Sequence, residues 1–431
     1  MKRKFQKGSP EELVSHIKSG DRIASTLANG NPYALYEALY QRRHDLENVD
    51  MNISLLVKPA KFLAGPAKKS FTVKTNFMGP IEAKLMDFGT TLDPRIIHLN
   101  RIPRVLVEDE KCNIIMLQAA PPDEEGRISL GVNPIDRETV EKFNTVMVQF
   151  NKNMPFVYPM EGFLTKDDID YYCEVDEPLV YLPPLKPTEE EKKIAELISE
   201  YVRDGDCIQL GIGSLAKAFV DPLKEKKHLG CHTELFSDPF VELIKAGAVD
   251  NSLKKVLPGK SLFAFAMGTK EMHDFLDHNE EVYSASYTYV NDPEVIRQND
   301  NVVSINSALE VDLTGQVCSE SIGFHQYSGT GGQVNFVRGA SLSKGGRSFI
   351  AFPSTYYSRK EKKLASKIKL ALTPGAAVTT LRTDVEYLAT EYGVAYLANR
   401  TIHERVKQMI GLAHPDFRDE LRFGAKKCGL L

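Results

Sequence analysis

The same order of local patterns occurs twice in this chain of 431 residues, and this repeat constrains the fold more than any other feature. A helical pattern near the N-terminus ends at Gly20-Asp21, and a short strand, a loop at Gly30 and a second helical pattern follow. From Glu189 the chain repeats this order, with Gly205-Asp206 and Gly213 in the matching places. A glycine between a helix end and a strand suits the left-handed C-cap position. The repeat therefore predicts two related α/β units in tandem.

A proline-rich segment separates the two units. Pro183, Pro184 and Pro187 stop helices and stiffen the chain between them. A chain of this length also exceeds one ordinary core. We therefore expect one α/β domain over residues 1–185 and a second over residues 186–431.

Short apolar runs alternate with helical patterns in both units. They predict buried strands of largely parallel sheets that helices cover on both faces. The predicted strands are Asn113–Leu117, Thr145–Phe150, Cys207–Leu210, Val302–Ile305 and Ser348–Phe352. Thr188, before three glutamates, and Asp416 are the predicted N-caps of two helices. Ligands of such sheets gather where the strands end.

Charge and composition exclude several classes of function. The net charge of −4 argues against a nucleic-acid binder that relies on a global positive field. The basic N-terminus has no apolar core of a secretory signal, and no apolar run approaches the ~20 residues of a membrane helix. The six cysteines are scattered without a CxxC pair, which predicts free thiols in a reducing cytoplasm and neither disulfides nor a zinc site.

The first candidate site is the loop Gly211-Ile212-Gly213-Ser214-Leu215, between a predicted strand and a helical pattern. Glycines let the backbone approach a ligand, and a helix N-terminus offers free N–H groups to a phosphate or an oxyanion. The third glycine of a dinucleotide fingerprint is missing, and no acidic residue follows at its spacing. On residue types alone, a tight strand–helix turn is the favoured explanation of the loop.

The second candidate is Glu234, which follows Gly230 closely and stands beside His232 and Thr233. This carboxylate could be a nucleophile, a general base or an ordinary glutamate at a helix start, and residue statistics favour the last. For His232 we expect a hydrogen-bonded structural imidazole.

The third candidate is the glycine-rich segment Ser328-Gly329-Thr330-Gly331-Gly332, with Lys344 and Arg347 following it. So many glycines indicate positive φ angles or the close approach of a large group. The two cations are candidate phosphate partners. A flexible loop with solvated cations is the alternative.

Together these pieces resemble the acetyl-CoA hydrolase/transferase family over nearly the whole chain, in particular its 4-hydroxybutyrate and butyryl-CoA:acetate CoA-transferases. The stretches that carry the resemblance are AAPPDEEGRISLG, NKNMP, GIGSLAKAF, GCHTELFSD, FAMGTKE, NDPEVI, INSALEVDLTGQV, GTGGQVNF, VEYLATEYGVA and AHPDFRDEL. Two departures stand out. The family usually has Asp where this chain has Asn335, and Pro is common in the first loop, where this chain has Leu215-Ala216.

The resemblance implies a role for each candidate residue. The glutamate that matches Glu234 forms a covalent glutamyl-CoA thioester in such enzymes. The backbone amides of Leu215 and Gly332 would donate to an oxyanion, and Asn291 would help to hold a second one. The residues that would contact coenzyme A are Gly211, Ile212, Gly213, Ser214, Leu215, Ser328, Gly332 and Lys344.

The resemblance also implies an activity: the transfer of CoA between acetyl-CoA and a short carboxylate, 4-hydroxybutyrate or butyrate, by a ping-pong mechanism. Coenzyme A would be substrate and covalent thioester, with no metal, no nucleic acid and no membrane involved. A homodimer is typical of such enzymes. An acetyl-CoA hydrolase of the same family and a non-catalytic nucleotide- or sugar-phosphate-binding module remain alternatives. A Rossmann dehydrogenase is disfavoured by its incomplete fingerprint.

Overall fold

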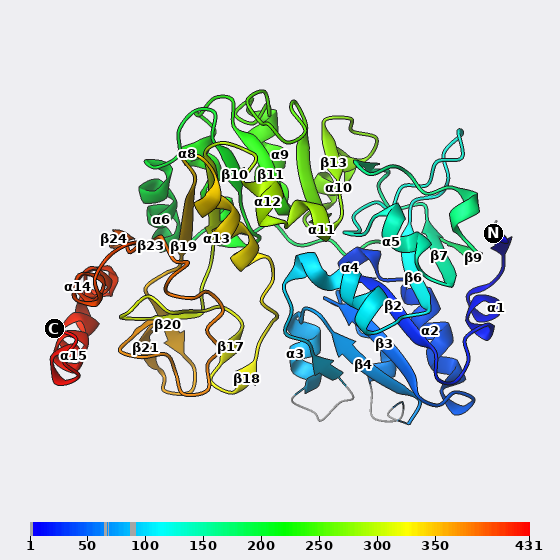
Figure 1. The fold of residues 1–431 in the computed structure, drawn as a ribbon, viewed down its shortest axis with the longest axis horizontal. Coiled ribbons are helices and arrows are strands. Elements are labelled where there is room, and N and C mark those ends of the chain that lie inside the picture. Colours follow the sequence, from blue (N-terminus) through cyan, green and yellow to red (C-terminus); the bar gives the residue numbers. More distant parts are fainter. Residues whose placement is uncertain (1–2, 64–66, 68, 87–91) are drawn as a thin grey trace.

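Each copy of the repeated pattern lies at the centre of its own parallel sheet (Figure 1). The computed structural model describes residues 3–63, 67, 69–86 and 92–431. In these residues the two large sheets have eight and nine strands, and three small sheets accompany them. The predicted fold class, two tandem related α/β units with mostly parallel sheets and helices around them, is confirmed.

The first sheet has the strand order β1-β9-β7-β6-β2-β3-β4-β5, and all neighbours in it pair in parallel. Its strands are β1 (Gln6–Lys7), β2 (Arg22–Leu27), β3 (Val49–Ser54), β4 (Phe71–Thr75), β5 (Leu92–Pro94), β6 (Ile114–Ala119), β7 (Thr145–Asn151) and β9 (Tyr171–Val175). The α-helices of this half are α1 (Pro10–Ser15), α2 (Tyr33–Gln41), α3 (Pro80–Met86), α4 (Ile102–Arg104) and α5 (Arg137–Glu141).

The second sheet has the order β24-β23-β19-β14-β10-β11-β12-β13-β8, and only β23 and β24 pair antiparallel among its described strands. Its strands are β8 (Tyr158–Pro159), β10 (Cys207–Gln209), β11 (Gly230–Phe236), β12 (Ser261–Ala266), β13 (Val282–Ser284), β14 (Val302–Asn306), β19 (Arg347–Ala351), β23 (Tyr387–Thr390) and β24 (Gly393–Tyr396). Strand β8 precedes the proline-rich segment in sequence, yet it pairs with β13 of this second sheet.

Helices and small sheets surround the second large sheet. The helices are α6 (Glu189–Ser199), α7 (Ser214–Ala218), α8 (Val220–Leu223), α9 (Asp238–Lys245), α10 (Lys270–Leu276), α11 (Tyr287–Val290), α12 (Pro293–Ile296), α13 (Gln333–Leu342), α14 (Ile402–Leu412) and α15 (Pro415–Lys427). The small sheets pair β15 (Glu310–Asp312) with β16 (Val317–Cys318) and β22 (Ile368–Lys369), β17 (Ser321–Ile322) with β18 (His325–Gln326), and β20 (Thr355–Ser358) with β21 (Lys363–Ser366).

The two repeats share their turn geometry. Gly20 and Gly205 have φ angles of +85° and +81°, in the left-handed region that the sequence predicts. The carboxylate of the next residue then accepts the N–H group three residues before it, from Lys18 to Asp21 and from Arg203 to Asp206, both at 2.7 Å. The internal repeat is therefore structural.

The five predicted strands are present as β6, β7, β10, β14 and β19, with bounds shifted by no more than two residues. The N-cap at Thr188 is confirmed as a capping box with Glu191, in which each side chain accepts the other residue's N–H group. The predicted N-cap at Asp416 is wrong. His414 is the N-cap of α15, because Pro415 takes the first helical position and leaves Asp416 inside the first turn.

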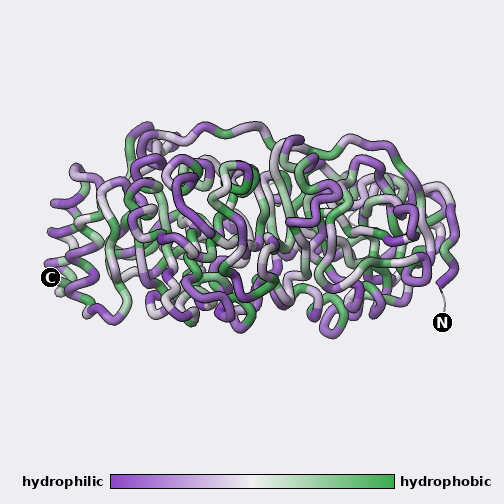
Figure 2. The backbone as a smooth tube through the Cα atoms, turned by 90° about the horizontal axis from the view of Figure 1, so that it is seen from above, coloured by the Kyte–Doolittle hydropathy of each residue, from purple (hydrophilic) through white to green (hydrophobic). Residues whose placement is uncertain are grey.

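A buried apolar cluster joins the two halves. It contains Leu27, Leu99 and Ile102 from the first half and Phe265 and Tyr287 from the second. Figure 2 shows the halves along the long axis, with the first described residues and helix α15 at opposite ends. Residues of both halves can therefore line one site. In the described part of the chain, no helix has the length and apolar character that crossing a bilayer requires.

Candidate active site

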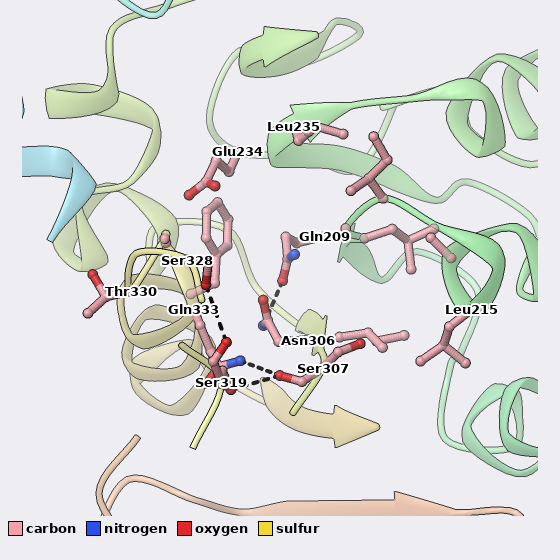
Figure 3. A pocket seen from close by; sticks show the side chains of 18 of the residues that line it. Gln209, Leu215, Glu234, Leu235, Asn306, Ser307, Ser319, Ser328, Thr330 and Gln333 are labelled. Carbon is pink, nitrogen blue, oxygen red and sulfur yellow. Dashed lines mark hydrogen bonds between the residues drawn. The ribbon is translucent and has the colours of Figure 1, made fainter. Parts of the chain in front are cut away.

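A cavity of about 270 Å³ lies where strands β10, β11 and β14 end (Figure 3). This is the edge at which parallel α/β sheets bind their ligands. Its walls are the loop after β10, the end of β11, the end of β14 and the glycine-rich segment before α13. Phe77 of the first half completes the lining, so the cavity lies between the two halves.

Six of the predicted site residues line this cavity: Gly211, Ile212, Leu215, Glu234, Ser328 and Gly332. Asn291 joins them indirectly, because its side chain contacts Glu234. The structure thus brings together the two loops and the carboxylate, which are far apart in sequence.

Three predicted coenzyme A contacts lie elsewhere. Gly213 faces a neighbouring pocket, and the hydroxyl of Ser214 donates to Glu191 Oε1 of helix α6 at 2.7 Å. Lys344 lies beyond the far end of α13, before β19 begins, where its carbonyl accepts the Asn301 N–H group. Helix α13 lies between Lys344 and the cavity, and the contact of Lys344 with coenzyme A stays a prediction. No lysine, Lys344 included, is among the described residues that line the cavity.

Glu234 lies within strand β11, so it is not the helix-start glutamate that residue statistics favour. Asn291 Nδ2 donates to Glu234 Oε2 at 2.5 Å, and the backbone N–H group of Gly332 is a second donor to the carboxylate. Loss of water around the side chain raises the pKa of Glu234 to about 7, although both donors oppose this shift. The carboxylate therefore exists in both protonation states near neutral pH.

Gly332 is a glycine because Glu234 and Asn291 leave no room for a side chain. A Cβ atom at this position would lie 1.8 Å from Glu234 Oε2 and 2.3 Å from Asn291 Nδ2. Gly332 is also the N-cap of α13, with φ −93° and ψ 8°, and its N–H group is free of helical bonding. The glycine-rich segment is thus shaped to place a backbone donor against the carboxylate.

A second, smaller cavity of about 20 Å³ also borders Glu234. Leu27, Leu99 and Ile102 of the first half and Phe265 and Tyr287 of the second contribute most of its surface, with Ser54, Leu55 and Phe77. Glu234 is its single charged residue in the described part of the chain, and it borders both cavities. The sequence offers no signal for these apolar residues, since they look like ordinary core positions.

The larger cavity has a mixed lining of apolar and polar groups and is nearly uncharged. Gln333 donates to Ser307 O at 2.7 Å and accepts from the hydroxyl of Ser319 at 3.1 Å, while Asn306 Nδ2 donates to Gln209 Oε1 at 3.1 Å (Figure 3). Apart from Glu234, no described lining residue carries a charge. The cavity therefore suits a neutral, amide-bearing ligand segment better than a phosphate.

The glycine-rich segment is tied to the first half. The hydroxyl of Thr330 donates to the Ile97 carbonyl at 2.7 Å. The segment therefore rests against both halves. No group of three or more histidine, cysteine, aspartate or glutamate side chains among the described residues is arranged to hold a metal ion.

Two family models match the chain. The acetyl-CoA hydrolase/transferase N-terminal domain covers residues 1–183, and the C-terminal domain of the same family covers residues 268–425. These matches confirm the family that the sequence motifs predict.

Curated relatives match over almost the full length. The 4-hydroxybutyrate coenzyme A transferase of Clostridium kluyveri is 39% identical over 97% of this chain and 96% of its own. The butyryl-CoA:acetate CoA-transferase of Anaerostipes caccae is 34% identical over 99% and 97%. An acetyl-CoA hydrolase of Saccharomyces cerevisiae matches only 55% of this chain and 45% of its own, at 27% identity.

Solved structures agree with these matches. RipA from Yersinia pestis superposes with a TM-score of 0.92 at 35% identity, over 99% of this chain and 98% of its own.

Proposed function

The chain belongs to the acetyl-CoA hydrolase/transferase family, and from that premise we propose that it is a CoA-transferase in which Glu234 is the covalent carrier. It exchanges coenzyme A between acetyl-CoA and a short carboxylic acid, 4-hydroxybutyrate or butyrate. The observation that carries this proposal is that Glu234 borders both a nearly uncharged cavity with amide side chains and a small apolar one, and that two N–H groups donate to it.

The two cavities fit the two parts of an acyl-CoA. The pantetheine arm of coenzyme A carries amides and no charge, which matches the amide side chains of Gln209, Asn306 and Gln333 in the larger cavity. The apolar residues around the smaller cavity match a short acyl chain in polarity, and the cavity of about 20 Å³ must widen to admit one. The thioester that joins them then lies beside the carboxylate, while the phosphates of coenzyme A remain outside the larger cavity.

The first half-reaction starts from the Glu234 carboxylate. It attacks the thioester carbonyl, the carbonyl oxygen becomes an oxyanion, and the carbon–sulfur bond breaks to release the CoA thiolate. The mixed anhydride that remains is attacked by this thiolate at the glutamyl carbonyl. The acid leaves as a carboxylate, and Glu234 holds coenzyme A as a thioester. A second acid reverses these steps, which gives ping-pong kinetics.

Backbone and side-chain amides stabilise the two oxyanions. Gly332 and Asn291 already donate to the Glu234 carboxyl group, so they are placed for the oxyanion that forms on the glutamyl carbon. The N–H group of Leu215, beside the larger cavity, serves the oxyanion of the incoming thioester. Each donor contributes ~2.7–4 kcal/mol in comparable sites. Every nucleophile in these reaction steps is an anion, so the reaction requires neither a metal nor a general base.

Water that reaches the anhydride or the thioester hydrolyses it, so a site that excludes water favours transfer over hydrolysis. The apolar cavity beside Glu234 supports this exclusion. We further propose a homodimer from the family resemblance, a cytoplasmic location from the scattered cysteines, and a division into domains 1–185 and 186–431 from the proline-rich segment. Gel filtration with light scattering tests the first of these.

The mass of the intact protein after incubation with acetyl-CoA tests the carrier role. We expect one added CoA on the wild type, none on Glu234→Ala, and loss of the adduct when acetate is added. Glu161→Gln is the matched control, because burial also raises the pKa of Glu161 to about 7 although it lines neither cavity. Steady thiol release without an adduct would indicate a hydrolase, and an adduct on Glu234→Ala would refute the assignment.

A further inference from the structure

The imidazole of His232 contacts the two elements that supply the N–H donors to Glu234. His232 and Glu234 are two residues apart on β11, so their side chains leave the same face of the strand. The ring is 1% exposed, and its Nε2 atom is 2.9 Å from the carbonyl oxygen of Val290. Val290 ends the single-turn helix α11, and the next residue is Asn291.

The contacts of Asn299 determine which ring nitrogen carries the proton. Asn299 Oδ1 accepts the N–H groups of Lys255 and Val256 at 3.1 and 2.9 Å, so its amide nitrogen faces the ring. That nitrogen is 3.1 Å from His232 Nδ1, which must therefore accept. Nε2 then bears the hydrogen and donates it to the Val290 carbonyl, a group that the end of α11 leaves without a helical partner.

The ring also contacts the second donor element. Phe336 of α13 meets it edge to face, with centroids 6.1 Å apart. Gly332 begins the same helix, and its carbonyl accepts the Phe336 N–H group. One side chain thus contacts both elements that place an N–H donor on Glu234.

We propose that His232 is a positioning residue, whose Nε2–H group holds the Val290 carbonyl and thereby fixes the Asn291 amide on Glu234. The proposal rests on the proposed role of Glu234. His232 takes no proton in the reaction. Burial and the nearby Lys254 ammonium lower its pKa to about 3, so the ring stays neutral at any working pH.

The substitution His232→Phe keeps the ring volume and removes both hydrogen bonds, and His232→Gln restores a donor near the Nε2 position. A displacement of about 1 Å of the Asn291 amide costs about 10²-fold in kcat. We therefore expect His232→Phe to lower kcat 10- to 100-fold with KM for acetyl-CoA changed less than about threefold, and His232→Gln to regain most of the loss.

His273→Phe is the matched control. This second buried histidine, 3% exposed, is 2.9 Å from the Thr269 carbonyl, and its other hydrogen-bond and ring partners among the described residues, Asn29 and Tyr181, lie outside the Glu234 site. It should reproduce any general loss of stability without the loss of kcat. In addition, His232→Phe combined with Asn291→Ala should be no slower than Asn291→Ala alone, because both remove the same interaction. If the losses of kcat in the two single variants multiply in the double variant, the proposal is wrong.

A titration that needs no turnover separates this proposal from the proposed function. In protein with ¹³C-labelled glutamate carboxyls, the signal missing in Glu234→Gln belongs to Glu234. Loss of the Asn291 bond should raise the titration midpoint of Glu234 in His232→Phe but not in His273→Phe. Tyr287, the other titratable group that faces Glu234 among the described residues, stays neutral because burial raises its pKa well above the usual value.

The outcomes are distinct. A raised midpoint in His232→Phe supports the positioning role, even if the wild type transfers CoA to no acid and the proposed function fails. An unchanged midpoint, with effects equal to those of the control, would mean that His232 only fills the core.

Discussion

Replacement of Gly332 by alanine tests the geometry of the site most directly. The new methyl carbon would lie 1.8 Å from Glu234 Oε2, whereas Cβ atoms in proteins essentially never lie closer than 3.0 Å to a non-bonded heavy atom. The carboxylate, the Asn291 amide or the start of α13 must therefore move by at least about 1.2 Å, the difference between these distances. The backbone angles at this position, φ −93° and ψ 8°, are open to alanine, so the fold itself should persist.

This displacement separates the nucleophile from its backbone donor. Loss of one such donor, or a misplacement of 1 Å, costs about 10²–10³-fold in kcat, which corresponds to ~2.7–4 kcal/mol. We expect Gly332→Ala to lose this factor in the exchange of butyryl-CoA with acetate, measured as initial rates of acetyl-CoA formation. The glutamyl-CoA adduct should form correspondingly slowly when intact mass is followed over time.

Gly411→Ala is the control for the substitution itself. Gly411 lies in helix α14, and a Cβ atom there meets nothing within 4 Å. The thermal midpoint of both variants should stay near that of the wild type. If Gly332→Ala keeps its rate within about threefold, the placement of the glycine-rich segment against Glu234 is wrong.

Three further predictions follow from the site. The pKa of Glu234 is raised to about 7 and its anion is the nucleophile, so kcat/KM should rise as pH increases through 7, and a flat profile from pH 5.5 to 8.5 would contradict this. Butyrate should exceed succinate by at least about 10²-fold in kcat/KM, since no described residue of the apolar cavity offers a cation to a second carboxylate, and equal values would place the acyl chain elsewhere. The phosphates of coenzyme A lie outside the larger cavity, so Lys344→Ala tests the contact that the family resemblance implies: KM for acetyl-CoA should rise if Lys344 binds a phosphate, and an unchanged KM would contradict that contact.

Much of the fold can be predicted from local chemistry. The paired glycines at Gly20 and Gly205 mark the two related units, and runs of apolar residues mark the central strands. Asp416 shows the limit of this reasoning. An aspartate near a helix start resembles an N-cap, but Pro415 before it already occupies the first helical position, and the preceding His414 takes the capping role.

The candidate site is predictable only in part. Glu234 and the two glycine loops carry motifs, and the structure brings them together. The apolar cavity has no such signal, because Leu27 and Ile102 become site residues only through the packing of one half on the other. Lys344 is close in sequence to the glycine-rich segment, but helix α13 carries the chain away between them, so Lys344 does not line the cavity.

Strand β8 has a consequence for how this molecule can be divided. Its residues, Tyr158–Pro159, precede the proline-rich segment and yet cover the outer strand β13 of the second sheet. Severing the chain at that segment would expose the main-chain groups of β13, and an open edge of this kind invites pairing with other chains. It would also uncover the apolar cluster that both halves share. We therefore expect a single calorimetric transition for the whole protein, and aggregation of residues 186–431 when they are produced alone.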